Sequence, residues 1–242
     1  MALKILLALL CAGVMLITPF YVKAQKNGAC KKSLALKMAA ATGYIAAGVL
    51  CALISGELSA FDRLIFCALG CSWIGDLFLH LWQKKIYTAI GFTGFLSAHF
   101  FFIAAYMNAI GRMLPERSFF SVQELLFVLT FDIFFVIFAL KTGIKLKGII
   151  ALPILLYATV ITTMLCKAVL LGAGAVTTGA ANAAAVCVFA VCGAALFVAS
   201  DFSISILMFN PRQKKNYPLK MFNMLTYFAA QLLLACLIIF NL

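Results

Sequence analysis

Four acidic residues lie inside long apolar runs of this sequence, where an ionisable side chain is costly and indicates a function. They are Asp76, Glu124, Asp132 and Asp201. His80 follows Asp76 by four residues, so the two side chains share one face if this segment is helical. Apolar surroundings favour the protonated form of a carboxyl group, while a second carboxyl can stay ionised. Such groups can supply an acid and a base to one reaction, or carry a cation.

The composition indicates that these residues are surrounded by a lipid bilayer. The chain has 242 residues, of which 66% are hydrophobic and 11% are charged. Soluble domains have about 45–50% apolar and about 25% charged residues, so too little polar surface remains here for a soluble protein. The apolar stretches are long and continuous, which favours α-helices over the short alternating segments of a membrane β-barrel.

Eight apolar segments approach or exceed the roughly 20 residues that a helix needs to span a membrane. They predict an all-α, polytopic membrane helical bundle that forms a single integral membrane domain over residues 1–242. Most of the nine cysteines lie in these segments without a C-x-x-C pair, and we interpret them as small helix- or lipid-facing residues. The expected helices run near residues 3–22, 35–56, 62–82, 86–108, 119–140, 148–171, 179–208 and 219–241.

Basic residues concentrate in every second loop, which predicts the orientation in the membrane. The first, third, fifth and seventh loops hold Lys23, Lys26, Lys31, Lys32, Lys84, Lys85, Lys141, Lys145, Lys147, Arg212, Lys214, Lys215 and Lys220. The other side holds Lys4, Arg63, Arg112 and Arg117. By the positive-inside rule the odd loops are cytoplasmic and both termini are non-cytoplasmic. The expected location is a bacterial inner membrane or, in a eukaryote, the endoplasmic reticulum, and no nucleic-acid partner is expected.

Residues 1–24 also resemble a signal peptide, because Lys4 precedes an apolar stretch that ends in Val22-Lys23-Ala24. Cleavage after Ala24 would leave seven helices. It would also require export of the lysines that follow, against the charge bias. We therefore predict eight helices and keep cleavage as the alternative.

The predicted orientation brings Asp76, Asp132 and Asp201 to a similar depth. They precede the next basic loop residue by eight, nine and eleven residues, which is roughly 12–17 Å along a helix. Other polar side chains approach this layer from helices of the opposite direction, so we expect a polar pocket in the cytoplasmic half of the bundle. The candidate substrate-binding residues are His80, His99, Tyr106, Tyr157, Tyr227 and Gln231.

Some buried polar residues have a purely structural interpretation. Asp132 is the acid that we least expect to be catalytic, since a membrane carboxyl group can simply accept hydrogen bonds from the next helix. His80 lies close to the interface and is expected to be a local partner of Asp76. Lys37 and Lys167 are expected to extend their ammonium groups to the membrane surface, although Lys37 could also meet a phosphate.

Several segments occur in a characteristic order: GCSWIGDLFLHL, GFTGFLSAHFFFIAAY, LLYATVITTM, GAALFVASDFSISI and LTYFAAQLLLA. In order, spacing and helix count they resemble the YhhN-type lysoplasmalogenase family of eight-helix membrane proteins, from about residue 35 to the end. Two positions depart from the family pattern, because Met38 follows Lys37 where a proline is usual and His80 replaces an expected apolar residue. The matching elements are Gly75-Asp76, Ala98-His99, Tyr106, Tyr157, Ser200-Asp201, and Tyr227 with Gln231.

The resemblance implies hydrolysis of a vinyl ether in a lysophospholipid to a fatty aldehyde and a glycerophospho-alcohol. A vinyl ether is activated by protonation of its β-carbon, and water then adds to the oxocarbenium ion. Glycosidases stabilise a similar cation with two carboxyl groups of unlike acidity. We therefore expect Asp201 as the proton donor and Asp76 as the base, without a cofactor. The expected partners are a lysoplasmalogen-like lysophospholipid and the membrane lipids.

Two alternatives stay open. Asp76, His80 and His99 could bind Zn²⁺ through one carboxylate and two imidazoles, which would suit hydrolysis of a lipid ester or amide. Buried acidic and histidine residues could instead serve a proton-coupled transporter. No inverted repeat is apparent in the sequence, and the main acids gather in one layer, which favours an enzyme over a transporter.

Overall fold

The computed structural model describes residues 1–26, 28–81, 84–144 and 151–242. Within these ranges the chain forms eight α-helices and a short 3-10 helix, and each α-helix is long and apolar enough to cross a membrane. The expected end at 82 and the expected start at 148 lie outside the described residues. The helices are α1 (Ala2–Ala24), α2 (Lys31–Ser55), α3 (Ala60–His80), α4 (Lys85–Met113), α5 (Val122–Lys141), α6 (Ala151–Thr177), α7 (Ala183–Phe209), α8 (Tyr217–Cys236) and η2 (Leu237–Phe240).

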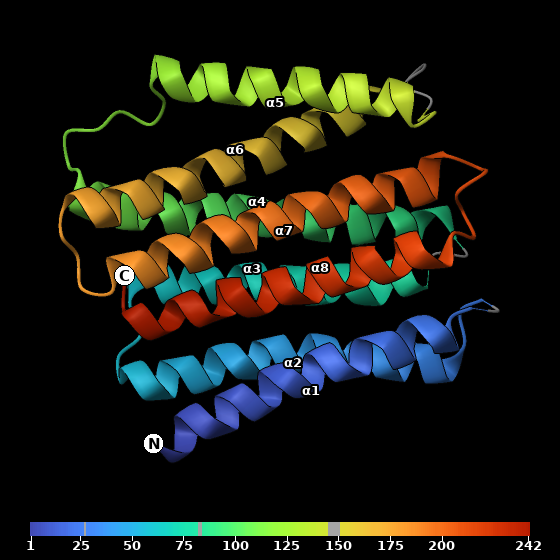
Figure 1. Ribbon diagram of the computed structural model, residues 1–242, viewed down its shortest axis with the longest axis horizontal. Coiled ribbons are helices and arrows are strands. Elements are labelled where there is room, and N and C mark those ends of the chain that lie inside the picture. The colour runs from blue at the N-terminus through green and yellow to red at the C-terminus, as the bar shows by residue number, and fades with distance from the viewer. Residues whose placement is uncertain (27, 82–83, 145–150) are drawn as a thin grey trace.

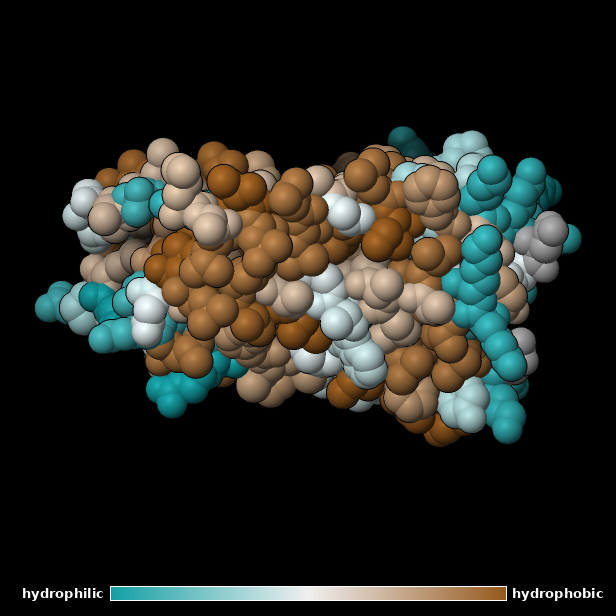
Figure 2. Space-filling model, turned by 90° about the horizontal axis from the view of Figure 1, so that it is seen from below, coloured by the Kyte–Doolittle hydropathy of each residue, from teal (hydrophilic) through white to brown (hydrophobic). Residues whose placement is uncertain are grey.

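The helices run side by side in alternating directions, as in a multi-pass membrane protein (Figure 1). The two termini lie at one end of the bundle. The opposite end, where α1, α3, α5 and α7 finish, we call the basic end, because its loops carry most of the described lysines. Figure 2 shows a broad apolar surface between hydrophilic ends, with many hydrophilic residues at the basic end.

The packing joins helices that are distant in sequence. α8 contacts α1, α2, α3 and α7, whereas α5 packs mainly on α6 and stands at the edge of the bundle (Figure 1). α1 packs along α2 and α8, and its Tyr21 and Val22 are buried.

α3 and α4 are the most closely packed pair. A Cβ atom on Gly94 would lie 3.0 Å from both the Cys71 carbonyl oxygen and the Gly75 nitrogen, so glycine is needed for this approach.

Glu124 lies at a helix end rather than inside a membrane-spanning run, which corrects the sequence prediction. α5 begins at Val122, and the Ser121 side chain and Glu124 form a capping box at its first turn. A Glu124 oxygen also lies 2.6 Å from Nζ of Lys167. Lys167 is fully buried instead of reaching the membrane surface, and it donates a second hydrogen bond to the carbonyl of Phe119. These contacts of Lys167 hold the start of α5 against α6.

Candidate active site

A cavity of about 690 Å³ opens within the half of the bundle nearest the basic end. It is bounded by α3, α4, α6, α7 and α8, with one residue each from α2 and α5. Most of its lining side chains are apolar, and a few polar groups converge on it, as is usual for small-molecule sites. The polar lining residues are Lys37, Asp76, Lys85, Thr88, Thr93, Tyr157, Ser200, Asp201, Ser205, Asn223 and Tyr227.

Asp76 is surrounded by hydrogen-bond donors. Lys37 on α2 places Nζ 3.0 Å from Oδ1 of Asp76 and also donates to the Asp76 backbone carbonyl at 2.9 Å. The hydroxyl groups of Tyr44 and Tyr227 donate to Oδ2 at 3.2 Å and 2.6 Å. Gln231 donates in turn to the Tyr227 hydroxyl at 3.1 Å. Each of these partners donates to the carboxyl group, an arrangement that favours the carboxylate form, and Asp76 is 1% exposed.

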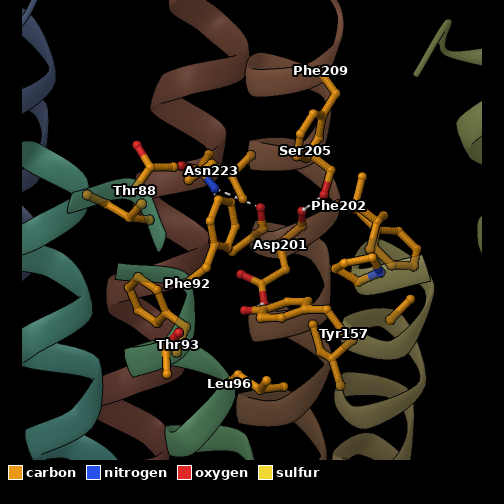
Figure 3. A pocket seen from close by; sticks show the side chains of 18 of the residues that line it. Thr88, Phe92, Thr93, Leu96, Tyr157, Asp201, Phe202, Ser205, Phe209 and Asn223 are labelled. Atoms are coloured by element: carbon orange, nitrogen blue, oxygen red, sulfur yellow. Dashed lines mark hydrogen bonds between the residues drawn. The ribbon is translucent and has the colours of Figure 1, made fainter. Parts of the chain in front are cut away.

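Asp201 has a different environment. Its Oδ2 atom lies 3.2 Å from Nε2 of His99 and accepts a hydrogen bond from the Tyr157 hydroxyl at 3.0 Å. Among the described residues, no hydrogen bond reaches Oδ1. The side chain is 13% exposed, and Figure 3 shows its carboxyl group beside Tyr157, with Phe92 across the cavity. One oxygen of Asp201 is therefore available to a bound molecule.

The partners of His99 indicate where protons lie. Nδ1 of His99 is 3.2 Å from the sulfur of Met164, and a thioether sulfur can only accept a hydrogen bond. Nδ1 therefore carries a proton toward the sulfur. Nε2 lies 3.2 Å from both Oδ2 of Asp201 and the Tyr157 hydroxyl. His99, Tyr157 and Asp201 thus form one hydrogen-bonded cluster beside the cavity.

Asn223 fixes the segment of α7 that carries Asp201. Its Nδ2 atom donates to the Ser200 carbonyl at 2.7 Å and to the Ser200 hydroxyl at 2.9 Å. These bonds join α8 to α7 one residue from Asp201. Asn223 is nearly fully buried and lines the cavity.

The structure brings only part of the predicted site to the cavity wall. Asp76, Tyr157, Asp201 and Tyr227 line the cavity. His99 and Gln231 lie behind Asp201 and Tyr227 and hold them by hydrogen bonds.

Two predicted residues lie elsewhere. Nε2 of His80 is 3.2 Å from the Ser33 hydroxyl, so its partner is Ser33 rather than Asp76. Tyr106 is buried against Phe102, and no hydrogen-bond partner for its hydroxyl occurs in the described part of the chain. Neither His80 nor Tyr106 is among the cavity-lining residues.

The alternative metal ligands are not brought together. Asp76 bonds to Lys37, His80 to Ser33 and His99 to Asp201. The described ranges contain no group of three or more His, Cys, Asp or Glu side chains placed to hold one metal ion.

Asp132 has the structural role that was expected of it. The hydroxyl groups of Thr159 and Thr162 on α6 donate to its two oxygens at 2.7 Å and 3.0 Å. It does not line the cavity. These bonds join α5 to α6, so Asp132 supplies a natural control for the two cavity acids.

Sequence reasoning missed three contributors to the site, namely Lys37, Tyr44 and Asn223. Lys37 is 4% exposed and paired with Asp76, so the expectation that it extends to the surface was wrong. A signal was present, because a lysine six residues inside a helix and a carboxylate near the same membrane face are natural partners. Tyr44 and Asn223 carried no such signal, since their partners depend on which helices are neighbours.

A model of the YhhN family matches residues 32–238. The chain belongs to the YhhN family. No curated protein and no solved structure gave a significant match. The matched YhhN region contains every polar residue that lines the cavity, from Lys37 to Tyr227.

Proposed function

We propose that this protein hydrolyses the vinyl ether bond of a membrane lysolipid, as lysoplasmalogenases do. One observation carries the proposal: two carboxyl groups with unlike partners line a single, mostly apolar cavity. Asp76 is held with Lys37 and two tyrosines, whereas Asp201 lies beside His99 and its Oδ1 accepts no hydrogen bond from the described residues. Membership of the YhhN family supports the same reaction class.

The reaction needs a proton donor within reach of carbon. We assign this role to Asp201, which transfers its proton to the β-carbon of the alkenyl ether. The C=C electrons form the new C–H bond, and the adjacent carbon and ether oxygen become an oxocarbenium ion. His99 and Tyr157 contact Oδ2, and the proton that reaches the substrate is the one that Asp201 carries on Oδ1, the oxygen that faces the substrate. General acid catalysis of this kind contributes about 10²–10⁴-fold to a rate.

The second requirement is a base for water, and we assign it to Asp76 acting through Tyr227. Tyr227 lines the cavity, and its hydroxyl is 2.6 Å from Oδ2 of Asp76. A water molecule attacking the cation gives a proton to the Tyr227 oxygen, while Tyr227 passes its own proton to Asp76. The buried negative charge of Asp76 also stabilises the cation, as a preorganised electrostatic group.

The resulting hemiacetal then collapses. Asp201, now ionised, takes the hydroxyl proton of the hemiacetal, and Asp76 returns a proton through Tyr227 to the departing glycerol oxygen. One water is consumed, and the products are a fatty aldehyde and a glycerophospho-alcohol. Both carboxyl groups regain their starting state, so the cycle balances without a cofactor.

The orientation in the membrane belongs to this proposal. With the basic end in the cytoplasm, the cavity lies in the cytoplasmic half of the bilayer and both termini are non-cytoplasmic. A lysolipid then reaches the site from the cytoplasmic leaflet, and its glycerophospho product leaves toward the cytoplasm.

The test uses purified protein, washed with chelator, and a matched pair of 1-alkenyl and 1-acyl lysolipids. We expect aldehyde from the alkenyl lipid only, with rates lowered by about 10²–10⁴-fold in Asp201→Asn and strongly lowered in Asp76→Asn. Asp132→Asn is the control and should retain the wild-type rate within about threefold, because its partners are two threonines away from the cavity. Release of fatty acid from the acyl lipid would instead indicate an ester hydrolase, and absence of both products would favour a transporter.

A further inference from the structure

Among the described residues, one cation on the cavity wall has no carboxylate partner. Lys37 is paired with Asp76, and Asp201 is paired with His99. Lys85, the first residue of α4, also lines the cavity and is exposed at the basic end. Within the described ranges, no acidic side chain forms an ion pair with Lys85. The mouth of the cavity therefore carries an unmatched positive charge.

The cavity also opens sideways. Along α4, the residues Lys85, Ala89 and Thr93 are four apart, so they form one stripe; each lines the cavity and is exposed. On α6, Pro153 and Leu156 likewise line the cavity and are exposed, Leu156 by 58%. Residues that face both the cavity and the outside mark an opening, and this one lies between α4 and α6.

The side opening lies at membrane depth and leads to Asp201. Thr93 is eight residues after the start of α4, about 12 Å along the helix axis. Phe92 of α4 and Tyr157 of α6 both line the cavity and meet edge to face, with ring centroids 6.1 Å apart. In Figure 3, Phe92 and Thr93 lie on one side of the Asp201 carboxyl group, and the Tyr157 ring lies next to it. A lipid chain could occupy this opening without leaving hydrocarbon.

We propose that the cavity binds a single-chain phospholipid from the side, with its phosphate at Lys85 and its chain passing between α4 and α6 into the bilayer. The ammonium group of Lys85 forms charge-assisted hydrogen bonds with the phosphate. The glycerol then extends from the mouth of the cavity toward Asp201. The bond that joins the glycerol to the lipid chain therefore lies beside the Asp201 carboxyl group. The inference rests on the proposed function only for the identity of the bond that is cleaved.

The phosphate contact is tested by binding rather than by turnover. The ligands are a 1-O-alkyl lysophospholipid, whose saturated ether cannot be hydrolysed by this route, and the matching 1-O-alkylglycerol without phosphate. Lys85→Gln should weaken binding of the phospholipid by about tenfold and leave binding of the alkylglycerol unchanged, because only the phospholipid has a phosphate that the lysine ammonium group can contact. Lys84→Gln is the control, since Lys84 lies over the Tyr87 ring and does not line the cavity.

Three outcomes would overturn the phosphate contact. One is that Lys85→Gln and Lys84→Gln weaken binding of the phospholipid equally. Another is that Lys85→Gln weakens binding of the phospholipid and of the alkylglycerol equally. The third comes from competition with free glycerophosphate: if it binds as tightly as the phospholipid, Lys85 serves a soluble phosphate and the chain has no role. Weak competition by glycerophosphate, together with the loss in Lys85→Gln, supports a lipid phosphate.

The side opening is tested by filling it. Ala89→Trp should weaken binding of a long-chain alkyl lysophospholipid by at least about tenfold and that of a short-chain analogue by less than about twofold. Ala104→Trp is a matched control on the same helix, because Ala104 is also exposed but does not line the cavity. Equal losses for both chain lengths, or the same loss in Ala104→Trp, would overturn the side entry.

These measurements separate the two proposals. If the alkyl lipid binds as described but no aldehyde forms from alkenyl lipids, the binding mode stands and the proposed reaction fails. If aldehyde forms but the Lys85 and Ala89 variants behave like their controls, the reaction stands and this binding mode fails.

Discussion

Two buried lysine–carboxylate pairs in the described part of the chain lie at opposite ends of the bundle and have different surroundings. Lys37 and Asp76 are 3.0 Å apart near the basic end, and Lys167 and Glu124 are 2.6 Å apart near the end with the termini. All four side chains are nearly or fully buried. The pairs share the same charges and similar burial, so charge and burial alone do not identify a catalytic group.

The surroundings distinguish the two pairs. The Lys167–Glu124 pair closes a capping box at the start of α5 and lies among the rings of Phe119 and Phe120. The Lys37–Asp76 pair lines the cavity and adds two tyrosine hydroxyls to the carboxylate. A buried ion pair joins helices wherever it occurs, but only the pair beside a cavity can act on a bound molecule.

The largest expected difference between the pairs is in activity. Lys37→Met should lower the rate of aldehyde release by about 10²-fold or more, because the Asp76 carboxylate then loses its counter-ion and takes up a proton. Lys167→Met should leave the rate per folded molecule within about threefold of wild type. The measurement is kcat normalised to the folded fraction, and a large loss in Lys167→Met would remove the distinction between the pairs.

In stability, by contrast, the two pairs should behave alike. Removing either lysine takes the closest cation from a buried carboxyl group, at a cost of about 3–5 kcal/mol, although Arg117 remains 3.8 Å from Glu124. The neutral double variants Lys37→Met/Asp76→Asn and Lys167→Met/Glu124→Gln should recover most of this loss. Thermal unfolding in one detergent measures the effect. The first double variant should be stable and inactive, and full activity in it would show that the Asp76 pair is only structural.

Smaller effects should separate the two tyrosines of the Asp76 pair. Tyr227 lines the cavity and lies 2.6 Å from Asp76, whereas Tyr44 is outside the lining and lies 3.2 Å away. Tyr227→Phe should lower kcat by about 10–100-fold, since the path for the water proton is lost, and Tyr44→Phe by less than about fivefold. Equal effects of the two variants on kcat would argue against transfer through Tyr227.

The smallest effect is expected at Tyr106, which belongs to neither pair. Its buried hydroxyl has no hydrogen-bond partner in the described ranges. Tyr106→Phe should leave kcat and KM within about twofold and should be neutral or stabilising by up to about 1 kcal/mol, because a desolvated hydroxyl is removed. A clear rise in KM would return Tyr106 to the substrate-binding residues.

The helices were predictable because a membrane span needs a long apolar run, and each run stands out in the sequence. The polar layer was also predictable, since counting residues from the basic loops gives depth along each helix. Asp76 and Asp201 were found in this way, and both line the cavity.

Partners and helix starts were harder to predict. Helix count does not say which helices are neighbours, so the bonds from Lys37 and Tyr44 to Asp76 required the packed bundle. Glu124 was misplaced although its signal is local: Ser121 and Glu124 have the spacing of a capping box, which marks a helix start rather than a helix interior. His80 was linked to Asp76 by helical spacing, but Ser33 lies closer to its ring nitrogen.

The most direct test of the central claim follows the proton to carbon. The protein is given a 1-alkenyl lysolipid in D₂O, and the aldehyde is reduced to the alcohol as it forms, so that it cannot exchange its hydrogens. Mass spectrometry then locates deuterium in the chain. If Asp201 protonates the β-carbon, the wild-type product carries a solvent deuterium on the carbon next to the former aldehyde carbon, and Asp201→Asn forms little product. An aldehyde without deuterium at that carbon would contradict protonation of the vinyl ether by the enzyme.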